Sequence, residues 1–476
     1  MKPAVDAAAP PASGPVELWL VKNHARLLDH GRRTLRAAAL AIVEAGIAGG
    51  DPARGTRAKV RCEGARLWVD GVHYDLRRVR RIWVVGAGKA SLAIASALED
   101  ILGERVAGGV IVTKKGDGRR LRRVDVIEAG HPVPDADSVR GARQMLAVAA
   151  AAEAGDIVFA AVTGGSSALA SLPPEGVTLE DLRALNELLL RCGAPIAVIN
   201  VVRRHVCRIK GGRLVAAIQP ARAITLTLNT ATPEMPWPDM CLADPTTFAD
   251  AIRILRDLEL WERTPASIRD HLLAGIRRPD METVKSVEGM NAQMVFVGDP
   301  VAVCSAAAEK AAELGFAPLV LGTFIEGEAR EVATAMAGIG REALDRGRPA
   351  RPPCALISGG ESTVTVSGAG GRGGPNQEFA VAFALKMGAR GPFACASIDT
   401  DGTDGPTDLA GGVVDDRTAA SARDAGIQLV EALRRHTSAD ALERLGDAVV
   451  TGHTGTNLQH IRVVVLGGAE SPGDAG

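Results

Sequence analysis

Short apolar runs alternate with helical spacings along most of this chain. Runs typical of buried strands occur at residues 81–85, 107–113, 124–128, 156–162 and 223–228. Between them, residues 138–154 and 178–191 repeat apolar positions at helical spacing, and Thr178 with Asp181 three residues later marks a helix start. Alternating strands and helices predict βαβ units, and therefore a parallel sheet covered by helices.

The same pattern indicates how the chain divides into domains. Residues 1–16 are rich in Pro and Ala and predict a flexible N-terminus, and residues 18–48 predict a helix that stops at Gly49 and Gly50. Four prolines within residues 229–245 predict a long loop, because proline cannot continue a regular element. Helices are expected at 248–259 and 265–275, and a second β/α series begins near residue 292. We expect a large first domain over residues 17–270 and a smaller one over residues 290–470, with the boundary between 255 and 290.

Composition supports this picture and excludes several classes of protein. A chain of 476 residues exceeds what one hydrophobic core usually supports, and 46% hydrophobic residues are typical of a folded protein. The net charge of -1 gives no field that would attract nucleic acid or a membrane surface. Seven scattered cysteines without a CxxC spacing argue against disulfides or zinc. Since no signal segment and no long apolar stretch occurs, we expect a cytoplasmic protein that is neither exported nor membrane-spanning.

The first candidate site is the loop that follows the strand at 81–85. Its sequence is Gly86-Ala87-Gly88-Lys89-Ala90-Ser91, and glycines between a strand and a helix let backbone N–H groups approach an anion. The loop is not a Walker A motif, and Ser91 occupies the third glycine position of a dinucleotide fingerprint. Lys89 could neutralise charge on a transferring phosphoryl group. A tight structural turn is the alternative interpretation.

A second loop with the same character follows the strand at 156–162. It contains Gly164, Gly165, Ser166 and Ser167, and two such loops in one sheet predict a polyphosphate ligand. The G-x-S-x-G pattern of serine hydrolases is not matched. Further along, Arg204 and Lys210 flank a glycine pair and predict a carboxylate or phosphate partner, although a solvated basic helix end remains open.

The second half of the chain carries acids beside glycines. One strand runs into Gly359-Gly360-Glu361, and Asn376 and Glu378 precede a helix. Residues 399–408 contain four aspartates, of which Asp399, Asp401 and Asp404 predict a site for Mg²⁺ with its waters. A calcium loop is disfavoured because Ala410 stands where a bidentate Glu would be needed. A polar turn held by Asp side chains is the remaining alternative.

Taken together and in this order, these segments resemble the glycerate 2-kinase family, whose C-terminal part is called the MOFRL domain and many members of which are labelled hydroxypyruvate reductase. The resemblance spans residues 18–466. It is carried by GAGKAS at 86–91, HPVPDADSVRGAR at 131–143, TGGSSAL at 163–169, NVVRRHVCRIKGGRL at 200–214, GEARE at 327–331, SGGEST at 358–363, GGPNQE at 373–378, DTDGTDGPTD at 399–408 and TGTN at 454–457.

The resemblance implies a fold, an activity and a set of site residues. It implies an α/β fold with a Rossmann-like large domain, a smaller C-terminal α/β domain and the active site in the cleft between them. It implies phosphorylation of the 2-hydroxyl of D-glycerate or a related small hydroxy acid with ATP and Mg²⁺, by a monomer or homodimer. The expected catalytic residues are Lys89, Arg204 and Lys210. Nucleotide binding is expected from Gly86, Gly88, Ser91, Gly164, Gly165, Ser166, Ser167, Gly359, Gly360, Glu361, Asn376, Glu378, Thr454 and Asn457.

The chain also departs from the family pattern. The two aspartates of an SDVxGD motif are replaced by Thr227 and Ala231, the arginine of GGRNQE by Pro375, and a proline before TGTN by His453. A divergent member with another substrate, or one that binds nucleotide without turnover, is therefore an alternative hypothesis. A reductase using NAD(P)H is a weaker one, because it would need the complete dinucleotide fingerprint.

Overall fold

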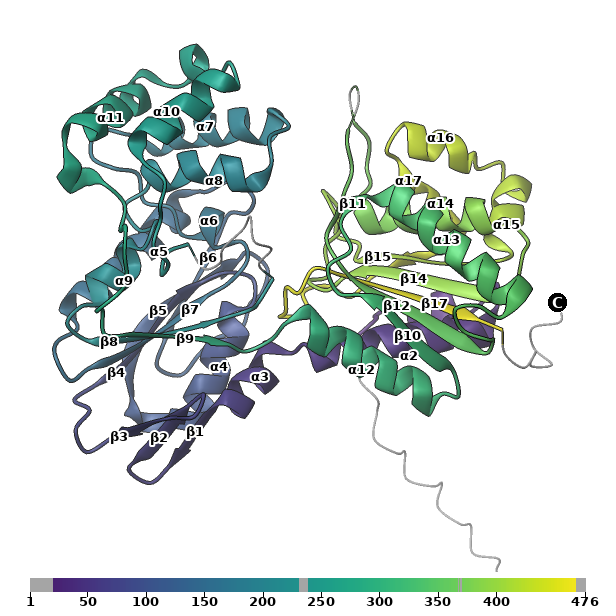
Figure 1. Ribbon diagram of the computed structural model, residues 1–476, viewed down its shortest axis with the longest axis horizontal. Helices are drawn as coiled ribbons and strands as arrows, with labels where there is room; N and C mark the ends of the chain where they lie inside the picture. Colours follow the sequence, from purple (N-terminus) through teal and green to yellow (C-terminus); the bar gives the residue numbers. More distant parts are fainter. Residues whose placement is uncertain (1–19, 231–238, 367, 369, 468–476) are drawn as a thin grey trace, which may run out of the picture.

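Two domains lie side by side in the computed structural model, each built around a six-stranded sheet (Figure 1). The structure describes residues 20–230, 239–366, 368 and 370–467. The segment 1–16, expected to be flexible, lies outside these residues. The expected α/β class, with a parallel sheet in a large domain and a second sheet in a smaller one, is confirmed.

The sheet of the first domain is parallel throughout, in the order β6-β5-β4-β7-β8-β9. Every residue of β7 is buried, as expected for a central strand covered on both faces. An antiparallel meander of three short strands, β1 to β3, lies beside the sheet (Figure 1). The strands are β1 (Val60–Glu63), β2 (Arg66–Val69), β3 (Val72–Asp75), β4 (Ile82–Ala87), β5 (Val106–Lys114), β6 (Asp125–Ala129), β7 (Ile157–Val162), β8 (Arg222–Thr227) and β9 (Ala292–Phe296).

Helices cover both faces of this sheet and also form a lobe above it. Alternate residues of β4 pack into different cores, Val84 with α4 and Val85 with α5, so these two helices lie on opposite faces. Helices α7, α8, α10 and α11 have a separate core and form the helical lobe at the top of Figure 1. The helices are α3 (Pro52–Lys59), α4 (Ser91–Leu102), α5 (Ala136–Ala151), α6 (Ser166–Leu169), α7 (Leu179–Arg191), α8 (Ile196–His205), α9 (Arg213–Ile218), α10 (Phe248–Asp257) and α11 (Ala266–Arg277).

The second sheet has the order β10-β12-β17-β14-β15-β16, and only its β10–β12 pair is parallel. Helices α2 and α12 share a core with one face of this sheet, and α13, α14, α16 and α17 with the other. A two-stranded ladder of β11 and β13 adjoins it. The strands are β10 (Ala317–Gly322), β11 (Gly327–Glu328), β12 (Cys354–Gly360), β13 (Ser362–Thr363), β14 (Phe393–Asp399), β15 (Gly411–Asp415), β16 (Ala448–Val449) and β17 (His460–Leu466). The helices are α1 (His24–Leu27), α2 (Arg33–Gly49), α12 (Pro300–Glu313), α13 (Ala329–Arg346), α14 (Pro375–Met387), α15 (Thr418–Asp424), α16 (Leu429–Arg434) and α17 (Ser438–Leu445).

The N-terminal helices differ from the prediction in two respects. The single helix expected over 18–48 is broken between α1 and α2, where Gly31 adopts a positive φ of 66° and the amide of Arg32 donates to Asp415. Moreover, α2 belongs to the second domain rather than the first. Its buried Arg36 pairs at 2.6 Å with both Asp415 and Asp447, and a buried cation needs such partners.

The expected boundary between 255 and 290 also differs from the structure. The strand β9 does not open the second sheet, because it pairs in parallel with β8 as the edge of the first sheet. Helices α2 and α12 both pack on the second sheet, but α2 precedes the first sheet in the chain and α12 follows it. The chain therefore crosses between the domains near Gly50 and near Gly298. These crossings lie together, and a Cβ atom on Gly298 would come within 3.6 Å of the Gly50 carbonyl oxygen.

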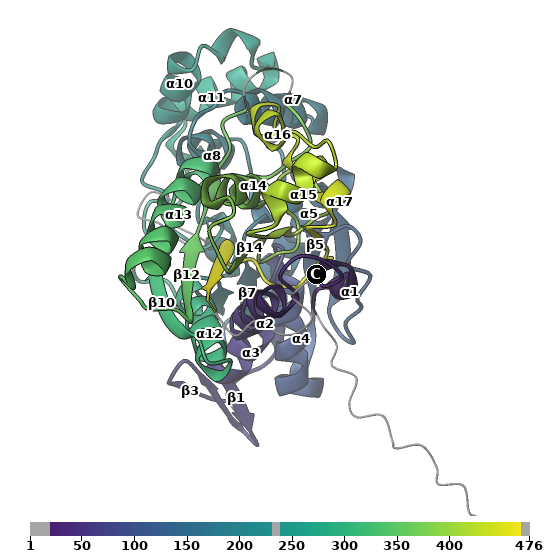
Figure 2. The same cartoon turned by 90° about the vertical axis from the view of Figure 1, so that its right-hand side faces the viewer.

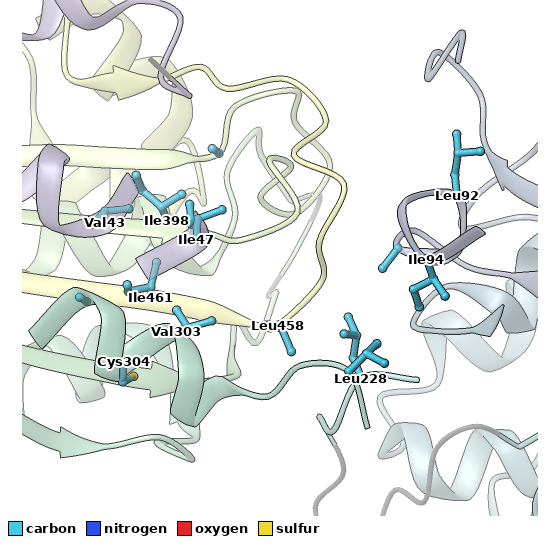
Figure 3. Packing of buried hydrophobic residues seen from close by; sticks show 14 of the residues in the cluster. Val43, Ile47, Leu92, Ile94, Leu228, Val303, Cys304, Ile398, Leu458 and Ile461 are labelled. Carbon is cyan, nitrogen blue, oxygen red and sulfur yellow. The ribbon is translucent and has the colours of Figure 1, made fainter. Parts of the chain in front are cut away.

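Apolar contacts surround these crossings. Leu228 and Leu458 lie between the two domains in Figure 3 and approach Gly298 from both sides. The view in Figure 2, turned by 90°, shows α2 and α12 next to each other, in agreement with their extensive packing. Among the described residues, no helix is long and apolar enough to cross a membrane.

Candidate active site between the domains

An ion pair between the domains marks the candidate site. Lys89 follows β4 in the first domain, and its ammonium group contacts the carboxylate of Asp401, which follows β14 in the second. Only 21% of the Lys89 side chain and 4% of the Asp401 side chain are exposed. Burial alone would lower the pKa of Lys89, but the charges of Asp401 and Asp399 outweigh it and raise the pKa above its ordinary value. Lys89 is therefore a charged ammonium in a partly closed cleft.

Residues from both domains line a small cavity around this pair. Thr113 and Lys114 of β5 contribute from the first domain, and Thr403 and His453 contribute from the second. A larger cavity of about 970 Å³ opens in the helical lobe, lined in part by Arg208 and His271. Neither glycine loop reaches that larger cavity, so we place the chemistry at Lys89.

The first glycine loop does not form the open anion cradle that its sequence predicts. The amides of Gly88, Lys89, Ala90 and Ser91 all donate to protein acceptors, among them the Gly164 carbonyl and the Thr163 hydroxyl. A Cβ on Gly88, whose φ is +139°, would lie 2.1 Å from Thr163 Oγ1, and one on Gly86 would lie 2.1 Å from the Ala161 carbonyl oxygen. These glycines permit close packing of two loops and fix Lys89, which corrects their expected role in nucleotide binding.

Ser91 is part of the same correction. Its side chain is fully buried, and its hydroxyl lies 3.2 Å from the Thr163 hydroxyl. It cannot reach a ligand in the cleft in this conformation.

The second glycine loop has the open amides that the first one lacks. Within the described part of the chain, the amides of Gly164 and Gly165 donate to no protein acceptor. A Cβ on Gly165, with φ +87°, would lie 3.3 Å from Cγ of Lys89, so these amides lie beside the lysine. Ser166 keeps a buried hydroxyl without a partner, and the Ser167 hydroxyl lies 3.5 Å from Asp239. This loop is the better candidate for contacts with phosphate.

Three carboxyl groups face Lys89 from the second domain. Asp399 ends β14, Asp401 follows it, and Glu361 follows β12. Burial and the charge of Asp401 raise the pKa of Asp399 well above its ordinary value. The same two causes raise the pKa of Glu361 to about 7, although 47% of its side chain is exposed and solvent reduces the effect. Burial alone would raise the pKa of Asp401, but the Lys89 charge and hydrogen bonds from Lys89 and Thr403 together outweigh burial and lower it below its ordinary value.

The carboxyl groups of this cluster fit a divalent cation. Burial and the charge of Asp401 disfavour the ionised forms of Glu361 and Asp399, and a bound divalent cation would favour them. Carboxylate oxygens are the ligands that Mg²⁺ prefers. Glu361, Asp399 and Asp401 could hold such an ion.

Asp404 was expected among the metal ligands, but its oxygens are already engaged. They accept hydrogen bonds from the Asn376 amide (3.1 Å), the Asn376 side chain (3.0 Å) and the Gln377 amide (2.9 Å) at the start of α14. Burial raises the pKa of Asp404 to about 7 despite these donors. Asp404 therefore holds the start of α14 in place, and its expected role as a metal ligand stays a prediction.

His460, which sequence reasoning missed, lies beside the acids. One oxygen or nitrogen from each of Asp399, Asp404 and His460 could surround an ion, since these atoms lie within 4.8 Å of one another. However, Arg462 donates to Nδ1 of His460 at 3.0 Å, and a guanidinium can only donate. The proton of the neutral ring is thus on Nε2, which lies 3.6 Å from Glu361 and 3.7 Å from Asp399. His460 faces the acids as a hydrogen-bond donor rather than as a ligand.

Several residues expected at the nucleotide lie inside the second domain instead. Asn376 is fully buried between Asp404 and Ser397, and Glu378 is fully buried against His436 at 2.7 Å. Gly359 and Gly360 lie within β12, and a Cβ on Gly360 would lie 2.3 Å from the Ile325 amide nitrogen. These four positions serve packing, because each faces the core of the second domain.

Arg204 and Lys210 were expected to be catalytic, and the structure gives both a bracing role. Arg204 is buried and donates to Asp244 at 3.2 Å. Lys210 is buried and donates to the Ser167 carbonyl at 2.7 Å, and burial lowers its pKa. Lys210 therefore holds the second glycine loop from behind, where it cannot contact a ligand in the cleft.

The TGTN segment does reach the cleft. A Cβ on Gly164 would lie 1.9 Å from Nδ2 of Asn457, so this side chain covers the second glycine loop from the other domain. The Thr454 hydroxyl donates to the Thr400 carbonyl and thereby joins the segment to the acidic loop. Both residues lie at the cleft, and their expected contact with the nucleotide stays a prediction.

The departures from the family pattern have local explanations. The Thr227 hydroxyl donates to the Val162 carbonyl at 2.7 Å, so it joins neighbouring strands in place of an acid. Pro375 is the first residue of α14, where a missing amide costs nothing. His453 lines the small cavity at Lys89. Ala231 lies outside the described residues.

His131 is a second functional candidate, which the sequence marked only as the first residue of the HPVPDADSVRGAR motif. Its ring lies 3.4 Å from the Cβ position of Gly165, next to Lys89. Burial and the Lys89 charge lower the pKa of His131 to about 4, so the ring is neutral at pH 7. The site thus holds a neutral imidazole beside its ammonium group.

Comparisons with known proteins agree with this arrangement. One family model, described as a domain of unknown function (DUF4147), matches residues 38–273, and the MOFRL family model matches residues 354–460. A glycerate 2-kinase of Pyrococcus horikoshii is 39% identical over 434 residues, which cover 91% of this chain and 97% of that protein. The chain belongs to the glycerate 2-kinase family.

Other similar proteins show how widely names vary around the glycerate 2-kinase family. A putative hydroxypyruvate reductase of Agrobacterium vitis is 40% identical over 392 residues, which cover 81% of this chain and 87% of that protein. The crystal structure of a glycerate kinase from Thermotoga maritima matches with a TM-score of 0.76 at 32% identity, covering 91% of this chain and all of that one. The family resemblance noted from the sequence motifs is confirmed.

Proposed function

We propose that this protein is an ATP-dependent kinase that phosphorylates the 2-hydroxyl of D-glycerate or a related small hydroxy acid. The proposal rests on the position of Lys89. Its charged ammonium group lies between the amides of the second glycine loop and the acids of the other domain. Phosphoryl transfer needs positioning and charge neutralisation more than covalent chemistry, and this site supplies both.

The acids on one side of the cleft support a site for Mg²⁺. Glu361, Asp399 and Asp401 would hold the ion, because their carboxyl groups gather beside Lys89 and their crowded charges would be relieved by a cation. When bound, Mg²⁺ would neutralise charge on the phosphates of the nucleotide. Lys89 contacts Asp401 on this side of the cleft.

The first domain supplies the groups that would contact the transferred phosphoryl. The amides of Gly164 and Gly165 lie beside Lys89 and have no acceptor among the described residues, and the neutral ring of His131 adds a polar contact without adding charge. Asn457 reaches the same loop from the second domain. Lys89 is the group best placed to accompany the phosphoryl from donor to acceptor oxygen.

A reductase activity has less support in this chain. The third glycine of a dinucleotide fingerprint is replaced by the buried Ser91, and the amides of that loop are already used. Thr227 replaces an aspartate of the family motif and bonds to the Val162 carbonyl instead. A screen of small hydroxy acids would therefore be needed to identify the substrate.

Replacing Lys89 tests the proposal. We expect Lys89→Met to lower kcat for ATP-dependent product formation on the order of 1,000-fold, because the charge that accompanies the phosphoryl is lost. Lys89→Arg keeps the charge and should fold like the wild type while remaining well below it in kcat. The matched control is Lys115→Met, which removes an exposed lysine paired with Asp135 near the end of β5. Product formation by Lys89→Met within a few-fold of wild type would exclude the proposed role.

A further inference from the structure

A second lysine lies at the same edge of the first sheet as Lys89. Lys114 is the last residue of β5, which pairs in parallel with β4, and Ala87 lies opposite Val112 in this pair. Lys89 and Lys114 each follow these paired residues by two positions, so both lie where the two strands end. The carboxyl ends of parallel strands are where open α/β sheets bind their ligands. Both lysines line the small cavity between the domains.

His131 belongs to the same edge, on the next strand. Ala129 of β6 lies opposite Lys114, and His131 follows Ala129 by two positions. Burial and the charges of Lys89 and Lys114 lower the pKa of His131 to about 4, which agrees with two ammonium groups near its ring. Three neighbouring strands thus bring two cations and a neutral imidazole to one edge, an arrangement that favours a negatively charged ligand.

The segment that follows Lys114 reaches the second domain. A Cβ on Gly116 would lie 3.7 Å from Nε2 of His453, and one on Gly455 would lie 3.6 Å from a terminal nitrogen of Arg119. These distances bring the end of β5 next to the segment of the second domain that contains TGTN. Lys114 therefore lies where the two domains meet, in agreement with its place in the cavity wall.

Lys114 differs from the other lysine and the two aspartates that line the cavity in having no partner. Lys89 contacts Asp401, and both oxygens of Asp117 accept hydrogen bonds from Arg119. Within the ranges that the structure describes, the ammonium group of Lys114 forms no hydrogen bond and no ion pair, although the residue is half-buried. A shielded charge without a partner is costly, and an anionic ligand would supply the partner.

We propose that Lys114 binds the phosphate chain of the nucleotide, while Lys89 accompanies the transferred phosphoryl. Asp401, one of the residues that would hold Mg²⁺, lines the same cavity, and the metal of a kinase is bound to phosphate oxygens. Phosphates held there would lie beside Lys114. An ammonium group is a point charge suited to phosphate, whereas a carboxylate is matched better by the two parallel donors of arginine. This inference rests on the proposed kinase function and names a nucleotide-binding residue for it.

Nucleotide binding by Lys114→Met provides the first test. Calorimetric titration with ATP in the presence of Mg²⁺, without a hydroxy acid, measures binding apart from turnover. We expect Kd for ATP to rise on the order of 30-fold, because a charge-assisted contact with phosphate is lost. Kd for adenosine, which carries no phosphate, should stay within about 2-fold. Lys114→Arg keeps the charge and should hold ATP within about 5-fold of the wild-type affinity.

The matched control is Lys115→Met, which removes the adjacent lysine, exposed and paired with Asp135, and should leave both Kd values unchanged. An unchanged Kd for ATP with Lys114→Met would overturn the proposal, as would an equal rise for ATP and adenosine. A rise in KM for D-glycerate with an unchanged KM for ATP would overturn it too, because Lys114 would then bind the substrate carboxylate. If Lys114→Met does not fold by circular dichroism, Lys114→Gln decides by the same criteria.

Product formation separates this inference from the proposed function. If the wild type binds ATP but phosphorylates no hydroxy acid, and Lys114→Met binds ATP far more weakly, the kinase function fails and the phosphate contact stands. If the wild type phosphorylates D-glycerate and Lys114→Met binds ATP equally well, the kinase function stands and the phosphate contact fails. A wild type that does not bind ATP would overturn both.

Discussion

The two glycine loops of the first sheet look alike in sequence and are used in opposite ways. Each follows a buried strand and precedes a helix, and they lie in contact, with the Lys89 amide donating to the Gly164 carbonyl. In the loop after β4, amides and glycines serve the packing between loops. In the loop after β7, the amides of Gly164 and Gly165 remain open beside Lys89.

This difference shows that glycine can be required between a strand and a helix for two separate physical reasons. One is space, because a neighbouring backbone leaves no room for a Cβ. The other is exposure of N–H groups to an anion. Only the partners of the amides distinguish the two, and the partners come from a loop distant in sequence.

The largest effect is expected where the first loop is tightest. Gly88→Ala should lower the free energy of unfolding by about 3 kcal/mol or more, because the new Cβ would meet Thr163 in a left-handed backbone. The control Gly103→Ala also has a positive φ but open space around it, and should cost about 1 kcal/mol. Urea denaturation measures both. Equal costs for the two variants would show that packing does not explain Gly88.

A smaller and different effect is expected in the second loop. Gly165→Ala should destabilise by about 1 kcal/mol, since its Cβ would meet side-chain atoms of Lys89 and His131 only at 3.3–3.4 Å. KM for ATP should rise about 10-fold, because the loop amides and Lys89 shift together. Gly176→Ala, with a similar φ of +81° and no neighbour within 4 Å, is the control. An unchanged KM for Gly165→Ala would argue that phosphate binds elsewhere.

Much of the fold could be predicted because local pattern and fold agree. The buried runs at 81–85 and 156–162 became central parallel strands β4 and β7. The pattern could not reveal that α2 packs on the second sheet, since that depends on Arg36 pairing with Asp415 and Asp447, which lie 379 and 411 residues later in the chain. Nor could the pattern show that β9 forms the edge strand of the first sheet.

The candidate site was predictable only in part. Lys89 and the acids Glu361, Asp399 and Asp401 meet as the motifs suggested. Asp404, Asn376 and Glu378 share those motifs but face the protein interior, which spacing alone does not disclose. Arg204 and Lys210 lie in a motif that suggested contact with an anion, and only their bonds to Asp244 and to the Ser167 carbonyl show what they contact in the fold.

The most direct test of the central claim is phosphorus NMR of the wild-type protein with ATP, Mg²⁺ and D-glycerate. The proposed site predicts one 2-phosphoglycerate formed for each ADP released, and no product when Mg²⁺ is removed by chelation. ATP that remains intact with D-glycerate and with a panel of small hydroxy acids would contradict a kinase centred on Lys89.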